Sequence, residues 1–238
     1  MTKSAAGQTE IGSQTLARGL RALMAVVESG DGMTVQQIAT ELGVHRTIAY
    51  RLLQTLASFG LVAHGADGVY RPGAALATLA DAYLPALRET ALPIMREFAD
   101  EIGCTVSLFV AERDEAVSIA LVEPTTTTHH LRFKAGMRTP IGRGSAGYAL
   151  LAAAPKVTGE PSAVTRARKR GYATSHGEVE VGAYGVAAPI PDSQPRACLN
   201  LITYREDQAK AAEKYIVEAA ARLGEALQQS RHLVASGQ

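Results

Sequence analysis

The chain has 238 residues, 47% of them hydrophobic, and this length and composition suit two compact domains with ordinary cores. Its formal net charge of +1 excludes a histone-like protein that holds nucleic acid by bulk charge, so any contact with nucleic acid must be local. The two cysteines form no disulfide framework, and the first dozen residues lack the apolar run of a signal peptide. No stretch approaches the roughly 18 apolar residues of a membrane span. These three observations favour a cytoplasmic protein.

Residues 13–73 show the pattern of three helices followed by a hairpin. Hydroxyl residues stand before the apolar repeats and glycines follow them, so helices are predicted at about 13–27, 34–42 and 44–59. Two short extended pieces around a turn rich in Gly and Asp, within residues 61–71, then predict a β-hairpin. A short helix, a tight turn, a longer helix and a hairpin are the parts of a winged helix-turn-helix.

The third predicted helix is apolar on one side and free of acids on the other. On a helical wheel Ile48, Leu52, Leu56 and Phe59 share the face that would dock on the first two helices. The opposite face offers guanidinium, hydroxyl, phenol and amide groups, which suits the DNA major groove because phosphates repel carboxylates, Arg pairs with guanine and Gln pairs with adenine. We therefore predict DNA contacts from His45, Arg46, Thr47, Tyr50, Arg51 and Gln54 on this helix and from His64 and Arg71 on the hairpin.

A different function for this helix stays open. Polar helix faces are commonly only solvated, and three-helix units also bind other proteins. A protein-interaction module, in which the face from Arg46 to Gln54 meets another protein, is therefore the alternative to DNA binding.

The pattern changes after residue 73. Residues 74–101 are helical but contain Pro85 and Pro93, and we expect a bend or break near each proline. We predict a disordered segment at 1–12, a linker helix at 74–84 and a second domain at 85–238. That domain mixes strand patterns, at 105–112, 116–123, 129–135, 184–191 and 196–204, with helical patterns at 145–154, 164–171 and 208–234, which predicts an α+β fold around a central antiparallel sheet.

A glycine-rich stretch, Gly142-x-Gly144-x-x-Gly147, marks the candidate ligand site of the second domain. It formally fits the dinucleotide fingerprint, but no parallel βαβ unit surrounds it, so we reject that interpretation. Glycines still allow a backbone to approach a ligand, and the helix that follows directs free N–H groups at it, so a small carboxylate would suit this place. The alternative is a plain helix start that binds nothing.

Other chemical signals in the sequence are weaker. His129 and His130 would point to opposite faces of a strand and not chelate one metal, and we predict no metal and no cofactor. The basic run at 166–170 could touch DNA but is interpreted as a solvated helix face. Cys104 and Cys198 are each interpreted as small core residues. An enzyme using Ser145 or Cys198 is a rival function, with His176 as the only nearby candidate base.

Two regions of the sequence resemble the IclR family of bacterial transcriptional regulators. Residues 135–154 (AGMRTPIGRGSAGYALLAAA) and 168–192 (RKRGYATSHGEVEVGAYGVAAPIPD) are similar to that family's effector-binding domain, which is GAF/PAS-like. The N-terminal part resembles the family's winged helix over SQTLARGLRALMAVVESGDGMTVQQIATELGVHRTIAYRLLQTLASFGLVAHGADGVYRPG. The resemblance implies a regulator, acting as repressor or activator, whose operator binding is modulated by a small molecule.

The resemblance also implies where the small molecule binds. Tyr184 and Ile202 add bulk relative to the family and Gly185 removes a side chain, so we expect a partly apolar pocket for an aromatic or short-chain organic acid. Glu178 and Glu180 need not line the pocket, because the segment 177–182 (GEVEVG) also fits a solvated turn. The stretch 156–162 is shorter than is usual in the family. Carried over by position, the pocket residues are Leu131, Phe133, Gly144, Ser145, Ala146, Ser175, Ala183, Tyr184, Gly185, Asn200 and Ile202.

The expected assembly is a homodimer, or a homotetramer built as a dimer of dimers. One recognition helix contacts only a few base pairs, and pairing two of them on half-sites about 34 Å apart is the usual remedy. The helix at 13–27 and the linker at 74–84 are the predicted dimer surfaces. The predicted partners are therefore a double-stranded DNA operator, a small-molecule effector and a second copy of the chain, with no membrane.

Overall fold

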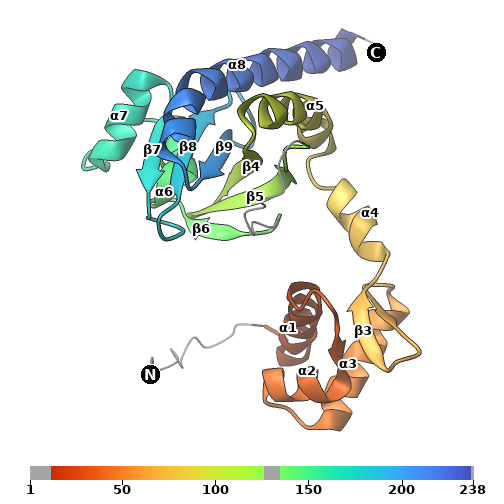
Figure 1. Cartoon of the computed structure of the whole chain (residues 1–238). Coiled ribbons are helices and arrows are strands. Elements are labelled where there is room, and N and C mark those ends of the chain that lie inside the picture. Colours follow the sequence, from red (N-terminus) through yellow and green to blue (C-terminus); the bar gives the residue numbers. More distant parts are fainter. Residues whose placement is uncertain (1–11, 126–134, 237–238) are drawn as a thin grey trace. The chain divides into compact units, whose positions relative to one another are not determined.

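The computed structural model describes residues 12–125 and 135–236 (Figure 1). The chain divides into two compact units, residues 1–83 and 84–238, which are described separately. Leu131, Phe133 and most of the strand expected at 129–135, with His129 and His130, lie outside the described residues. In the described part, no helix is long and apolar enough to cross a membrane.

The N-terminal unit is a winged helix-turn-helix. Side-chain caps begin its helices: the Ser13 hydroxyl accepts from the Leu16 N–H, and Thr34 forms a capping box with Gln37. A two-residue strand that the sequence did not indicate pairs with the hairpin to make a three-stranded sheet. The elements are α1 (Gln14–Glu28), β1 (Met33–Thr34), α2 (Val35–Leu42), α3 (Arg46–Ser58), β2 (Val62–His64), β3 (Val69–Pro72) and α4 (Ala75–Asp81).

The core of this unit corrects part of the helical wheel of α3. The buried face consists of Ala49, Leu52, Leu53 and Leu56, whereas Ile48 is 40% exposed and Phe59 71% exposed. The small Ala49 lets α3 approach its neighbours closely. The buried face of the helix is therefore rotated by about one residue from the face that carries Ile48 and Phe59. The polar face of α3 remains outside this core, as predicted.

The C-terminal unit is an α+β domain, and this fold class was predicted. Two short strands, β6 and β7, were missed because three or four residues carry too little alternation to be recognised. The elements are α5 (Pro85–Ile102), β4 (Thr105–Glu112), β5 (Glu115–Val122), β6 (Arg138–Pro140), α6 (Gly144–Ala152), α7 (Ser162–Arg170), β7 (Ala173–His176), β8 (Tyr184–Pro189), β9 (Ala197–Thr203) and α8 (Glu206–Ser236).

The six strands form one antiparallel sheet in the order β6-β5-β4-β9-β8-β7. Helices α5 and α8 lie side by side on one face (Figure 1), where Val106 and Leu108 of β4 point into the larger core. Within each strand the alternate residues, such as Phe109 of β4 and Cys198 of β9, point to the other face and pack with α6 and α7. The candidate ligand site lies on this second face.

One of the two expected proline breaks is absent. Pro85 is at the start of α5, directly after Leu84 in the left-handed region, as a proline at the first helical position allows. Helix α5 continues through Pro93, so the prediction is wrong as to a break there, and a bend at Pro93 stays a prediction. Proline removes only one helical hydrogen bond, and the buried side chains of Ala91 and Met95 hold the helix on the sheet on both sides of that point.

Candidate DNA-contacting surface and effector cavity

The outward face of α3 is exposed and cationic. The residues predicted there are all exposed, and the guanidinium groups of Arg46 and Arg51 form no ion pair within the described residues. The helix contains no acid, so nothing on it repels a phosphate. A groove between α3 and the wing is lined by Val35, Arg46, Thr47, Tyr50, His64, Gly68 and Tyr70.

His45 stabilises the start of α3, in addition to any contact that it makes with DNA. It is the N-cap of α3, and its Nδ1 accepts from the Thr47 N–H at 3.3 Å and lies 3.1 Å from Thr47 Oγ1. The Nδ1 edge is therefore engaged, and only the Nε2 edge is left for a partner. The cap also fixes the start of α3, which is the end that recognition helices insert into the groove.

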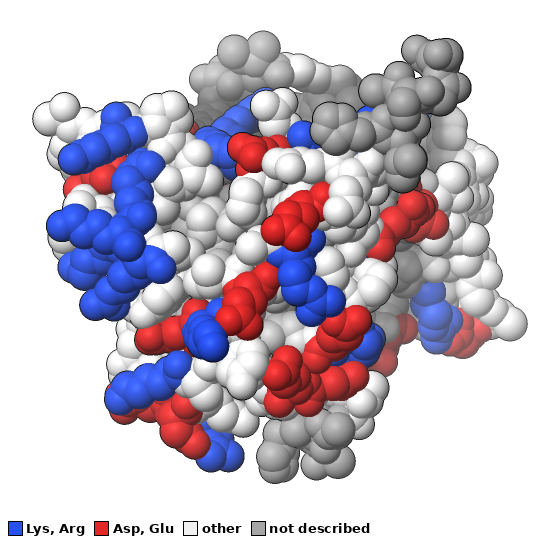
Figure 2. Space-filling view, turned by 90° about the horizontal axis from the view of Figure 1, so that it is seen from above, with Lys and Arg blue, Asp and Glu red and all other residues white. Residues whose placement is uncertain are grey.

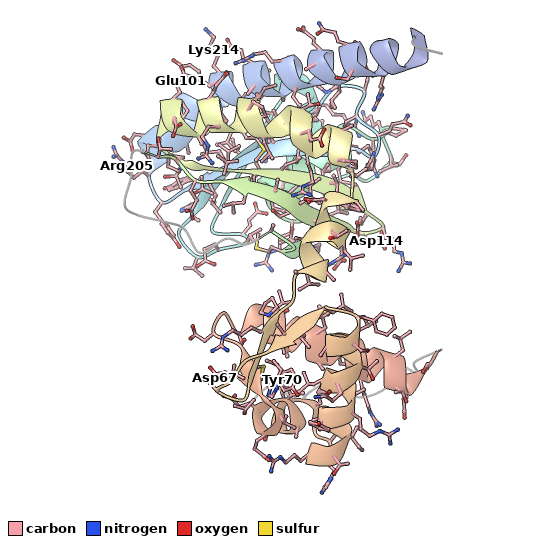
Figure 3. All side chains as sticks on the ribbon, turned by 90° about the vertical axis from the view of Figure 1, so that its right-hand side faces the viewer. Asp67, Tyr70, Glu101, Asp114, Arg205 and Lys214 are labelled. Carbon is pink, nitrogen blue, oxygen red and sulfur yellow. The ribbon has the colours of Figure 1, made fainter. Side chains whose placement is uncertain are left out.

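Gln54 and His64 are joined through a buried tyrosine. Gln54 Nε2 donates to the Tyr70 hydroxyl at 3.1 Å, and the His64 ring stacks on the Tyr70 ring with centroids 4.4 Å apart. Tyr70 is fully buried within the N-terminal unit (Figure 3). This arrangement holds the wing against α3, so it fixes the width of the groove between them.

Arg71, predicted to contact DNA, is already paired in the wing. Its guanidinium donates to Asp67 Oδ1 at 3.1 Å and Oδ2 at 2.6 Å, and Asp67 Oδ1 also accepts from the Val69 N–H. The hydrogen bond from Arg71, followed by that from Val69, lowers the pKa of Asp67 to about 2. Asp67 lies at the turn of the hairpin (Figure 3), so Arg71 reaches a phosphate only if this exposed ion pair opens.

A cavity of about 30 Å³ lies between the start of α6, the segment 177–182 and the second face of the sheet. Most residues predicted for the effector line it: Gly144, Ser145, Ala146, Ser175, Ala183, Gly185, Asn200 and Ile202. Sequence reasoning missed Ser107, Phe109, Met137, Thr139, Arg143, Val179 and Glu180. Strand register brings Ser107, Phe109 and Thr139 to the site, and register is not visible in the sequence.

Tyr184 was predicted to line the cavity and does not. Its neighbours Ala183 and Gly185 do, and successive residues of a strand point to opposite faces. The Tyr184 ring instead stacks on His176, with centroids 4.0 Å apart and planes 9° apart. His176 is therefore engaged with Tyr184, and it is not among the residues that line the cavity.

The start of α6 is occupied by groups of the chain itself. The Glu178 carboxylate accepts from the Gly144 N–H at 3.0 Å and from the Tyr148 hydroxyl at 2.7 Å. Ser175 Oγ accepts from the Ser145 N–H at 3.0 Å. Burial first, and then the bond to Glu178, raise the pKa of Tyr148. Glu178 thus caps a helix instead of standing free in a solvated turn, whereas Glu180 is exposed as expected but also lines the cavity, which the sequence did not indicate.

Two glycines are required by close approaches in this site. Gly144 has a φ of +77°, and a Cβ there would lie 2.6 Å from Val179 Cγ2. A Cβ on Gly185 would lie 2.3 Å from Ser145 Oγ. The missing side chain at Gly185 thus makes room for the Ser145 hydroxyl, which donates to Asn200 Oδ1 at 2.7 Å.

The two candidate nucleophiles are not activated. The Ser145 hydroxyl donates to an amide oxygen, which is no general base. Cys198 is fully buried, and burial raises the pKa of its thiol, which disfavours the thiolate. Cys104 is also buried, and it was predicted as a core residue.

The basic run of α7 is only partly a solvated face. Arg166, Lys169 and Arg170 are exposed, and Figure 2 shows Lys and Arg side chains gathered over α7. Arg168 instead points inward. Its guanidinium donates to the carbonyls of Leu151, Ala152 and Ala154 at 2.6–2.9 Å and to the Glu160 carboxylate at 3.1 Å. It therefore caps the C-terminal end of α6 and corrects the sequence interpretation.

Comparison with known proteins agrees with this two-unit organisation. Residues 15–65 match the model of the IclR helix-turn-helix domain, and residues 84–160 match that of the bacterial transcriptional regulator IclR C-terminal domain. The chain belongs to the IclR family. It is thus a member of a family of DNA-binding transcriptional regulators, as the sequence resemblance predicted.

Curated relatives in the IclR family include two enterobacterial repressors. The chain is 30% identical to the transcriptional repressor IclR of Escherichia coli over 63% of its own length and 55% of that protein. It is 28% identical to the acetate operon repressor of Salmonella typhimurium, over 58% and 52%. The matches thus span about half the length of these relatives.

Solved structures of IclR-family proteins share the fold. An IclR homologue from Microbacterium hydrocarbonoxydans, complexed with 4-hydroxybenzoate, matches with a TM-score of 0.74 at 24% identity over 91% of this chain and 100% of that one. A regulator from Alicyclobacillus acidocaldarius matches with a TM-score of 0.72 at 24% identity over 91% and 99%. At this identity the likeness establishes the fold of the IclR-family chain.

Proposed function

We propose that this IclR-family regulator binds an operator through the outward face of α3 and changes its DNA binding when a small molecule occupies the cavity on the sheet of the C-terminal unit. The observation that carries the proposal is the exposed, acid-free face of α3 with two arginines that form no ion pair within the described residues. Such a face suits base edges and phosphates of the major groove. The protein would act in the cytoplasm, where bacterial DNA is.

The size of the cavity bears on the kind of effector. The homologue complexed with 4-hydroxybenzoate shows that one protein of this fold carries an aromatic acid. The cavity here measures about 30 Å³. A benzene ring is accommodated by a cavity of roughly 150 Å³. A short-chain effector therefore fits this arrangement better than an aromatic one, unless the segment 177–182 moves away from α6.

We expect Ser145→Leu to abolish the response to the effector and to leave operator binding intact. Leucine at this buried position fills the space beside Gly185 and removes the bond to Asn200. The measurement is footprinting on the DNA next to the protein's own gene, with and without a small-molecule extract of the host cell. Thr174→Leu is the matched control, because Thr174 is the chain neighbour of Ser175 but is exposed and outside the cavity lining. A retained response in Ser145→Leu places the effector elsewhere.

We propose that α1 and α4 form the surface of a homodimer. Leu16, Leu20 and Met24 are 62%, 49% and 59% exposed and share one face of α1, while Leu79 on α4 is 60% exposed. An apolar stripe of this kind usually marks a protein interface. Sedimentation of the purified full chain at micromolar concentration should give at least the mass of a dimer, and a monomer at that concentration would contradict the proposal.

A further inference from the structure

The interior of the cavity holds two polar groups that no other described residue uses. Ser107 of β4 and Asn200 of β9 are register partners, 3% and 7% exposed, and both line the cavity. The bond from Ser145 to Asn200 Oδ1 leaves the amide nitrogen as a donor. Within the described residues, neither the Ser107 hydroxyl nor the Asn200 amide nitrogen has a hydrogen-bond partner. Neither atom is among the fully enclosed, unpartnered side-chain atoms of the described residues, so both open into the cavity, where they are available to a ligand oxygen.

The charges around the cavity decide what kind of oxygen that is. The first two N–H groups of α6, where a carboxylate would otherwise bind, already donate to Glu178 and to Ser175. Among the described lining residues the ionisable ones are Arg143 and Glu180, and both are exposed. An ionised acid buried beside Ser107 would have no buried cation among the described lining residues to offset the loss of hydration. A carbonyl or hydroxyl oxygen needs only the two neutral donors.

We infer that the effector is a short-chain hydroxy or oxo compound whose uncharged oxygen is bound by Ser107 and Asn200, while its acid group, where it has one, stays outside at Arg143. This inference rests on the proposed effector cavity and reverses the binding direction expected from the sequence, in which a carboxylate meets the start of α6. The apolar side chains of Phe109 and Ile202 contact the carbon chain. Ser107 is then the residue that distinguishes an oxygenated ligand from a plain acid.

The experiment uses three probes of equal chain length: 3-hydroxypropionate, propionate and 1,3-propanediol. Each is titrated into the full-length protein and followed by ligand-observed NMR, which detects millimolar binding. We expect 3-hydroxypropionate to bind about two- to tenfold more tightly than propionate, the effect of one neutral hydrogen bond. Ser107→Ala should remove that difference and weaken 1,3-propanediol by the same factor. Ser118→Ala is the control, because Ser118 is 2% exposed, also has an unpartnered hydroxyl, and lies on β5 outside the cavity lining.

Three outcomes overturn the inference: equal binding of propionate and 3-hydroxypropionate, an undiminished preference in Ser107→Ala, or no binding of any probe. These outcomes are separable from failure of the proposed function. If extract-driven release from the operator is lost in Ser145→Leu while no probe binds, the cavity is the effector site and the ligand class inferred here is wrong. If release survives in Ser145→Leu, the cavity itself is wrong.

Discussion

Arg51→Ala is expected to weaken operator binding by about 10- to 100-fold, the value of one bidentate contact to a base. Arg51 is exposed on the acid-free face of α3 and forms no ion pair within the described residues, so its full charge is available to DNA. If the contact is to a phosphate instead, the slope of log affinity against log salt should become shallower by about 0.9. Fluorescence anisotropy of a labelled operator across a salt series distinguishes these cases.

Asp67→Asn provides the opposite change as a control. It removes the carboxylate that holds Arg71 in the wing, without changing the shape of the side chain. Without the carboxylate, Arg71 can reach a phosphate, so the slope of log affinity against log salt should become steeper by up to about 0.9. The affinity for random-sequence DNA should rise as well. Unchanged binding in Arg51→Ala would remove α3 from the mechanism, and an unchanged slope in Asp67→Asn would place the wing away from the DNA backbone.

The N-terminal unit could be predicted to a large extent from local patterns. Apolar spacing, hydroxyl caps and terminal glycines are local signals, and they gave three helices and a hairpin with bounds close to those of α1, α2, α3 and the wing. The hydrogen bond from Gln54 to Tyr70 and the pairing of Arg71 with Asp67 could not be predicted, because they depend on how the hairpin folds back in space. These contacts decide which predicted side chains are free to meet DNA.

The cavity was less predictable, for reasons of register. Positions carried over from the family resemblance, such as Ser175 and Asn200, were placed correctly although they are distant in sequence, whereas Arg143 was missed inside the glycine-rich stretch. Ser107 and Phe109 were also missed, because they come from a strand more than thirty residues away that pairs beside β9. One error was avoidable. Ala183 and Gly185 share a strand face, and strand alternation alone excludes Tyr184 from it. The role of Glu178 could not be read from the sequence, since a carboxylate in a glycine-flanked turn is usually solvated.

Arg168→Met is expected to lower the melting temperature by at least about 5 °C, because it leaves carbonyls at the end of α6 without this donor and the Glu160 carboxylate without its cation. Arg166→Met, two residues earlier, removes an exposed guanidinium whose one hydrogen bond among the described residues is to Ser162, so it should change the melting temperature by no more than about 1 °C. Equal losses in the two variants would show that Arg168 acts only through the charge of α7. Differential scanning calorimetry of both variants measures the contrast.

The dependence of the free energy of unfolding on pH in the acid range gives a second test of the contact between Arg168 and Glu160. The hydrogen bond from Arg168 is the largest cause that lowers the pKa of Glu160 below its ordinary value of 4.5. A carboxyl whose pKa is lowered by folding stabilises the folded state fully above its ordinary pKa, and this contribution is lost as the pH falls through the lowered value. The stability difference between wild type and Arg168→Met should therefore be largest above pH 4.5 and narrow below it. The bonds to the α6 carbonyls do not titrate in this range, so a part of the difference should persist in acid, and its complete disappearance would show that Arg168 acts through Glu160 alone.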